Sequence, residues 1–182
     1  MRFKRDVRHM RRFKAIKILC AAILAATTRF DGFRIVHFSL QRTHLHLIVE
    51  AEHESVLSKG MQGLNTRLAR QFNKLLGRKG TFFADRYHAT VVAIPLVARR
   101  VLAYVLNNWR RHREAPHHRP ERVDAFSSAP WFDGFAKRTG GSAEPCPVSA
   151  PRCDLLKRAW KNHGLIHTWE VPAGAQRRQR AT

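Results

Sequence analysis

The sequence predicts the α+β class, with an antiparallel sheet and helices packed on it. Two short runs rich in Val, Ile, Phe and Leu, residues 33–41 and 43–50, are separated near Arg42, which favours a hairpin. Longer segments with apolar residues at helical spacing lie before and after them. The resulting order of helix, strand, strand, helix, strand, helix is typical of an antiparallel sheet covered by helices.

Residues 10–29 are predicted to form the first helix. Apolar residues recur at helical spacing along one side, at Ile16, Leu19, Ile23 and Ala26. The basic start followed by an apolar run at 18–26 also resembles a signal peptide, but Lys17 interrupts that run early and the spacing favours a packing helix. No run approaches the roughly 18 apolar residues of a membrane span.

A second helix is predicted between Ser55, whose hydroxyl suits a helix cap, and Gly77, which suits a helix end. Its apolar stripe comprises Leu57, Met61, Leu64, Leu68, Phe72 and Leu75. Its opposite face carries Arg67, Arg70, Lys74 and Arg78. Aromatic and branched residues from 80 to about 92 predict a third strand or extended segment. Pro95 then opens a helix that continues to about residue 112.

The composition changes near residue 115. Proline, glycine and histidine become frequent and no period is sustained, which indicates a domain boundary. One short helix at 155–163, closed by Gly164, is expected to pack back on the body, and residues 176–180 are expected to be disordered. We therefore divide the chain into a basic segment (1–9), a catalytic-sized core (10–115) and a loop-rich basic extension (116–182).

The charge balance indicates the class of partner. Lys and Arg total 34 against 13 Asp and Glu, a net charge of +21. Such an excess attracts polyanions, and the basic residues occur throughout the chain, so nucleic acid rather than a membrane is the expected partner. The three cysteines, Cys20, Cys146 and Cys153, are odd in number and sparse, which favours a reducing compartment and hence the cytoplasm.

The sharpest local pattern is His44-Leu45-His46 in the second predicted strand. Alternate side chains of a strand share a face, so the two imidazoles project together while Leu45 and Leu47 point toward a core. Two adjacent imidazoles are a ready pair of metal ligands, although two solvated histidines on a half-exposed strand would give the same pattern. The tripeptide alone leaves both interpretations open.

Tyr104 and Asn108 supply the context for the two histidines. They are four residues apart on a predicted helix, so their side chains lie one above the other. A His-hydrophobic-His strand followed by such a helix resembles the HUH-type single-tyrosine transposases, and among them the REP-associated tyrosine transposases. Three further segments are similar to this family: 63–73, 77–80 and 83–88. The resemblance covers roughly residues 30–113.

The resemblance implies a ferredoxin-like (RRM-like) core in which His44, His46 and Asn108 bind a divalent ion, Mg²⁺ or Mn²⁺, and Tyr104 is the nucleophile. Metal-assisted attack on a phosphodiester of single-stranded or hairpin DNA would give a 5′-phosphotyrosine and a free 3′-hydroxyl. Because the covalent link stores the phosphodiester energy, another 3′-hydroxyl can displace the tyrosine and rejoin the DNA. A homodimer is a further expectation from the resemblance.

Two other expectations come from the resemblance. Family members usually have a strand before the first helix, and only about nine strongly basic residues precede it here, so we expect the first strand to be missing. The candidates for phosphate contacts or base stacking are Arg67, Arg70, Lys74, Arg78, Arg86 and Tyr87. Tyr87 is also a rival nucleophile, but only Tyr104 has an asparagine partner at helical spacing.

Three alternatives are open. His37 and His88 each begin a His-x-Ser/Thr tripeptide, the type used by metal-independent 2H RNA phosphoesterases. A decayed transposase or basic RNA-binding module would bind nucleic acid in a salt-dependent way without a covalent adduct. A zinc set is conceivable, although its spacing does not match the usual fingers: Cys146, Cys153, His163 and His167.

Overall fold

The computed structural model confirms the α+β class. It describes residues 1–7, 9–114, 119–137, 139 and 141–172, so the disorder expected at 176–180 lies outside the described residues. The strands are β1 (Phe33–Leu40) and β2 (Leu45–Ala51). The helices are α1 (Phe13–Arg29), α2 (Glu54–Leu76), α3 (Pro95–Arg111) and α4 (Asp154–Lys157), with 3-10 turns η1 (Ala129–Trp131) and η2 (Ala159–His163).

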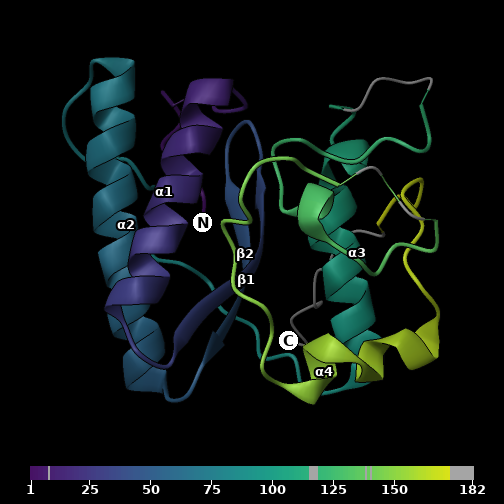
Figure 1. The fold of residues 1–182 in the computed structure, drawn as a ribbon. Helices are drawn as coiled ribbons and strands as arrows, with labels where there is room; N and C mark the ends of the chain where they lie inside the picture. Colours follow the sequence, from purple (N-terminus) through teal and green to yellow (C-terminus); the bar gives the residue numbers. More distant parts are fainter. Residues whose placement is uncertain (8, 115–118, 138, 140, 173–182) are drawn as a thin grey trace, which may run out of the picture.

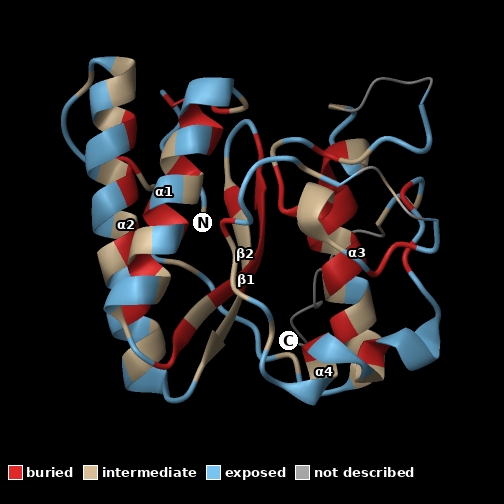
Figure 2. Cartoon of the chain, viewed as in Figure 1, coloured by how far each residue is buried: buried red, intermediate tan, exposed pale blue. Residues whose placement is uncertain are grey.

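The sheet separates two layers. Helices α1 and α2 pack together against one face of β1 and β2, and α3 lies against the other face (Figure 1). The buried residues form two corresponding clusters (Figure 2). Phe38 and Leu45 belong to the cluster on the α1–α2 side, while Val36 and Ile48 belong to the cluster that contains α3 and the C-terminal segment.

The predicted hairpin is confirmed, and it contains a β-bulge. β1 and β2 pair antiparallel, with Ser39 opposite His46, and the register shifts between Ile35 and His37. Strict alternation would place Val36 and His37 on opposite faces. Instead Val36 belongs to the α3-side cluster, and His37 contacts Phe132, which packs against the same cluster. The bulge therefore turns one extra side chain toward α3.

No regular strand precedes α1 among the described residues, yet the place beside β2 is occupied. Arg2 forms an antiparallel bridge with His44, and Phe3 forms one with Phe83. The Phe3 amide donates to the Thr43 carbonyl at 2.9 Å, and the Phe3 side chain is 2% exposed. The expectation of a missing strand was too strong, because backbone pairing needs no particular sequence and one buried phenylalanine anchors the segment.

Two other predictions were wrong in detail. The segment 80–92 forms no regular strand: Phe83 pairs with Phe3, but the residues after it are mostly exposed, Val91 at 88%, so burial does not favour a longer strand. Ser55 does not cap α2, which begins one residue earlier at Glu54, with His53 at the cap position. Gly77 does end this helix, in the left-handed conformation with φ 63°.

The C-terminal extension packs on α3. Its predicted short helix is divided into α4 and η2 at Arg158, and Trp160 is buried against the α3-side cluster. The Asn107 amide donates to the His167 carbonyl at 2.8 Å, and the Arg99 guanidinium makes two 2.7 Å hydrogen bonds to the Glu170 carboxylate. These contacts hold α3, and with it the residues that α3 presents to the sheet.

The helices were compared with the length and hydropathy of a membrane span. Within the described part of the chain, no helix combines the length and the apolar character needed to cross a membrane. The apolar side of α1 is used for packing instead: Ile16, Leu19, Ile23 and Ala26 are all buried, as the helical spacing predicts.

His37 makes the stability of the fold depend on pH. Its Nδ1 lies 3.0 Å from the Ser128 hydroxyl, and burial lowers its pKa from 6.5 to about 4, although Asp133 acts in the opposite direction. The unfolded chain binds this proton near pH 6.5 and the folded chain only near pH 4, so protonation favours unfolding as the pH falls through this window.

We therefore expect the free energy of unfolding to fall between pH 7 and pH 4, and His37→Asn to reduce that fall by about 3 kcal/mol. Urea unfolding at both pH values measures the effect. His88→Asn, which replaces an exposed histidine, should leave the pH dependence unchanged. Equal pH dependence in the His37 variant and the unmodified protein would contradict the assignment.

Candidate metal and nucleophile site

The two histidines of the tripeptide lie together on the face of the sheet that α3 covers. Their ring centroids are 4.6 Å apart with an angle of 83° between the planes. Leu45 and Leu47 point to the other face, into the cluster with α1 and α2. The alternation of β2 thus separates two imidazoles from the apolar residues between them, as the strand pattern predicts.

Helix α3 brings Tyr104 and Asn108 to the same place. The Tyr104 ring packs edge to face on His46, with 5.1 Å between the centroids. Asn108 follows one turn later on α3 and is fully buried. Pro95 begins α3 at its first position, where the missing amide hydrogen costs nothing. The four-residue spacing places Asn108 on the same side of α3 as Tyr104, one turn further on.

Polar atoms without partners occur within this cluster. His46 Nε2 and both amide atoms of Asn108, Oδ1 and Nδ2, are enclosed and have no hydrogen-bond partner among the described residues. A buried polar atom left without a partner costs about 1–3 kcal/mol. An imidazole nitrogen and an amide oxygen are donors suited to a divalent cation, so these residues fit a metal ion as their missing partner.

Histidines, cysteines and carboxylates alone do not complete such a site. Across the part of the chain that the structure describes, no group of three or more of these side chains is arranged to hold a metal. The candidate donor set therefore depends on the Asn108 amide oxygen in addition to the histidines. This observation also disfavours the zinc set suggested by Cys146, Cys153, His163 and His167.

The electrostatic surroundings keep both imidazoles uncharged. Burial lowers the pKa of His44 to about 4, with smaller contributions from His112, the N-terminal ammonium and Arg2. Burial lowers the pKa of His46 to about 3, and His44, the N-terminal ammonium and His112 act in the same direction. At neutral pH both rings are thus neutral and carry a free lone pair, the state in which histidine binds metals.

His112 is a residue of this cluster that sequence reasoning missed. It is the residue after α3, and its ring lies 5.2 Å from the His44 ring, centroid to centroid. Burial, followed by Arg111 and Arg11, lowers its pKa. The sequence spacing could have identified His112, because it follows Asn108 by four residues just as Asn108 follows Tyr104.

The other candidate residues lie elsewhere. On the α2 face, Arg67, Arg70 and Lys74 are exposed. Arg78 is engaged: it donates to the Asp6 carboxylate at 2.7 Å. Arg86 is exposed in the segment between α2 and α3, while Tyr87 is partly buried against the cluster with α1 and α2.

The pair proposed for a 2H phosphoesterase differs in its surroundings. His37 is buried with its Nδ1 occupied by Ser128, whereas His88 is exposed. Two catalytic histidines of that mechanism must both reach one phosphate, and the enclosed His37 ring is poorly placed for this.

Comparison with known proteins identifies the family. A family model described as "Transposase IS200 like" matches residues 4–108, more than half of the chain. The chain belongs to this family. The match includes His44, His46 and Tyr104 and ends at Asn108, so it spans the whole cluster apart from His112. Neither a curated protein nor a solved structure matches the chain. Membership in the IS200-like transposases implies DNA as the partner.

Proposed function

We propose that this IS200-like family member is an HUH-type, single-tyrosine transposase of the REP-associated kind that cuts and rejoins single-stranded or hairpin DNA. The observation that carries the proposal is the packing of the Tyr104 ring on His46, whose Nε2 has no hydrogen-bond partner among the described residues, with the similarly unpartnered Asn108 amide one turn further along α3. A hydroxyl nucleophile next to neutral metal-binding groups is an arrangement suited to metal-assisted phosphoryl transfer.

His44, His46 and Asn108 would hold the divalent ion, Mg²⁺ or Mn²⁺. When bound, the ion would polarise the scissile phosphate and neutralise charge on its oxygens. The chain itself supplies the nucleophile. The bond between the Tyr104 oxygen and phosphorus forms as the bond from phosphorus to the 3′-oxygen breaks, and the phenol proton passes through solvent to the leaving oxygen. The products are a 5′-phosphotyrosine and a free 3′-hydroxyl.

The pairing of the sheet supports a ferredoxin-like (RRM-like) core. Across the sheet, the segment at Phe83 pairs with Phe3, Arg2 pairs with His44 at the start of β2, and β2 pairs with β1. If the two short segments count as strands, the N-terminal segment is the first strand in the chain, β1 the second, β2 the third and the Phe83 segment the fourth. Their order across the sheet is then 4-1-3-2. In this arrangement the N-terminal segment lies directly beside the proposed metal ligands.

The surface candidates complete the proposal for substrate binding. Arg67, Arg70, Lys74 and Arg86 are cations that can contact phosphates, and Tyr87 offers an aromatic ring. Arg78 is already paired with Asp6, so a phosphate would have to compete with a carboxylate for it. Arg67, Arg70 and Lys74 are therefore the first residues to test as phosphate contacts.

The decisive experiment traps the covalent intermediate. End-labelled single-stranded hairpins from the DNA flanking the gene are incubated with the protein in Mn²⁺ or in EDTA, and denaturing gels reveal any protein–DNA adduct. We expect an adduct that requires Mn²⁺ and is lost in His46→Ala. Calorimetry should show weaker Mn²⁺ binding by the same variant, because a donor has been removed.

His53→Ala, which removes an exposed histidine near the start of α2, serves as the matched control and should form the adduct normally. An adduct of equal yield in EDTA would contradict the role of the metal. DNA binding without an adduct across many hairpins would instead support a binding-only protein that descends from a transposase.

A further inference from the structure

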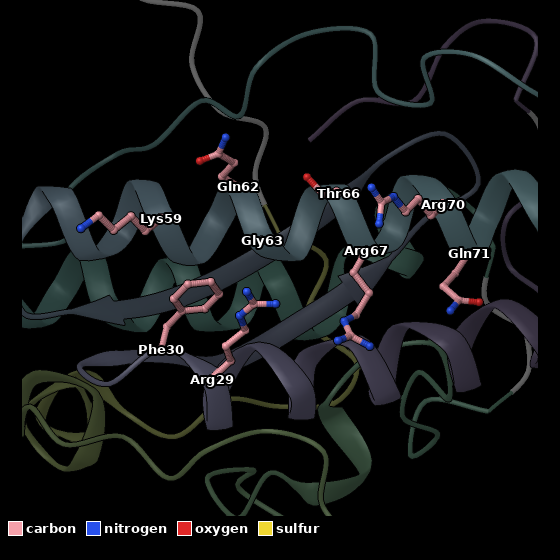
Figure 3. Close-up of a pocket in the computed structure, with 9 residues that line it drawn as sticks. All are labelled: Arg29, Phe30, Lys59, Gln62, Gly63, Thr66, Arg67, Arg70 and Gln71. Atoms are coloured by element: carbon pink, nitrogen blue, oxygen red, sulfur yellow. The ribbon is translucent and has the colours of Figure 1, made fainter.

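A groove of about 530 Å³ lies between the end of α1 and the middle of α2. It belongs to the helical layer, so the sheet separates it from α3 and the His44–Tyr104 cluster (Figure 1). Arg29 at the end of α1 and Arg67 on α2 point toward the space between the helices, and Lys59 and Arg70 line the groove on either side of them along α2 (Figure 3).

The positive charge of this groove is not neutralised. Neither aspartate nor glutamate lines it, and none of its four cations makes an ion pair with a residue that the structure describes. By contrast, Arg11, Arg78 and Arg99 each have a carboxylate partner within 3.0 Å. Four cations left without counter-charges around one hollow favour an anionic ligand.

Phe30 and Gly63 shape the groove and restrict what it can bind. The Phe30 ring lies against the backbone of α2, since a Cβ added at Gly63 would be 2.6 Å from the ring. The Arg29 guanidinium lies 5.6 Å from the centre of the same ring. The Phe30 ring thus contacts α2 through its edge and has the Arg29 guanidinium over one face, so the groups that line the hollow are chiefly cationic and polar. The groove therefore suits phosphates.

The α2 cations of the groove, Lys59, Arg67 and Arg70, form a charged row. The length of this row favours a polymer of phosphates over a single phosphate. Lys59 and Arg70 are eleven residues apart on α2, which corresponds to about 17 Å along the helix axis. A stacked nucleic-acid strand advances about 3.4 Å per phosphate, so the row can follow several consecutive phosphates.

We propose that the groove is a second DNA site, which binds the phosphate backbone on the face of the sheet opposite the nucleophile. This inference rests on the proposed function, and it adds Arg29 and Lys59 to the surface candidates. In this proposal the α1–α2 layer binds DNA independently of its sequence, and the residues of α3 and β2 carry out the cleavage reaction.

Salt-dependent binding tests the groove separately from catalysis. In a Tyr104→Phe background, fluorescence anisotropy measures the affinity for a labelled single strand of about 30 nucleotides and for a hairpin of the same length at several salt concentrations. Affinity falls as salt rises, so the slope of log affinity against log salt is negative. Each lost phosphate contact should reduce the magnitude of this slope by about 0.7 on the single strand and about 0.9 on the hairpin stem.

We expect Arg67→Ala/Arg70→Ala to reduce the magnitude of the slope by about 1.4 to 1.8, and Arg29→Ala, on the other wall, to reduce it by a further 0.7 to 0.9. The control Lys137→Ala/Lys157→Ala removes two exposed lysines of the C-terminal extension and should change the slope by less than about 0.3. An unchanged slope in the groove variants, or an equal loss in the control, would overturn the proposal. Absence of a covalent adduct would leave this binding result unaffected.

Discussion

Tyr104→Phe is expected to abolish the covalent protein–DNA adduct, with a loss of at least about 10³-fold in rate, because removing the nucleophile of a phosphoryl transfer leaves no group to form the bond. The substitution removes one oxygen and keeps the ring that packs on His46 at 5.1 Å. Folding and DNA affinity should therefore persist. Single-turnover assays with end-labelled hairpins in Mn²⁺ measure the rate.

Tyr87→Phe is the matched control, since Tyr87 is the only other tyrosine in the chain. It should retain adduct formation. If Tyr104→Phe still formed the adduct while Tyr87→Phe did not, the nucleophile would be Tyr87, and the His46–Tyr104 contact would be only a packing contact. If both variants formed it, Tyr104 would not be the required nucleophile.

Arg11→Met is expected to destabilise the fold by about 3–5 kcal/mol, because it leaves buried carboxylates without their counter-charge. Arg11 donates to both oxygens of Asp124, at 3.0 and 2.7 Å, and lies 2.9 Å from Glu114. Burial raises the pKa of Glu114, and Arg11 opposes that rise. The pair joins the segment before α1 to the C-terminal extension. Urea unfolding at pH 7 measures the loss.

Two further variants separate the lost ion pair from the lost side-chain volume. Arg12→Met changes the neighbouring arginine, whose exposed side chain donates to the His9 carbonyl and makes no ion pair with a described residue, so it should cost less than about 1 kcal/mol. Arg11→Met/Asp124→Asn should recover part of the stability because the uncompensated aspartate charge is gone. Equal destabilisation by Arg11→Met and Arg12→Met would show that the buried pair contributes nothing.

The juxtaposition of residues at the candidate Tyr104 site was partly predictable from the sequence, and the reason is local geometry. His44 and His46 differ by two positions, and Tyr104 and Asn108 by four. Strand alternation and helical rise alone place each pair on one face. The distance between the two pairs, however, depends on how α3 packs on the sheet, and that packing is held by Arg99, Asn107 and the C-terminal segment.

The less successful predictions share a cause. Met1 to Lys4 contains too few apolar residues to suggest a strand, and the segment pairs only because β2 and Phe83 offer backbone partners on either side. Conversely, residues 80–92 have strand-forming side chains, but among the described residues they form a β-bridge only at Phe83. Strand formation at a sheet margin is decided by the partner, which a local pattern does not contain.

By itself, the sequence determined the α+β class, the hairpin, the three long helices, the shared face of His44 and His46 and the polyanionic character of the partner, because these follow from period, caps and charge. Only the tertiary structure decided the place of His112 beside His44, the burial of His37, the Arg11–Asp124 pair and the groove of Arg29 and Arg67. Each of these joins residues far apart in the chain, and such contacts depend on how whole elements pack rather than on the pattern within any one of them.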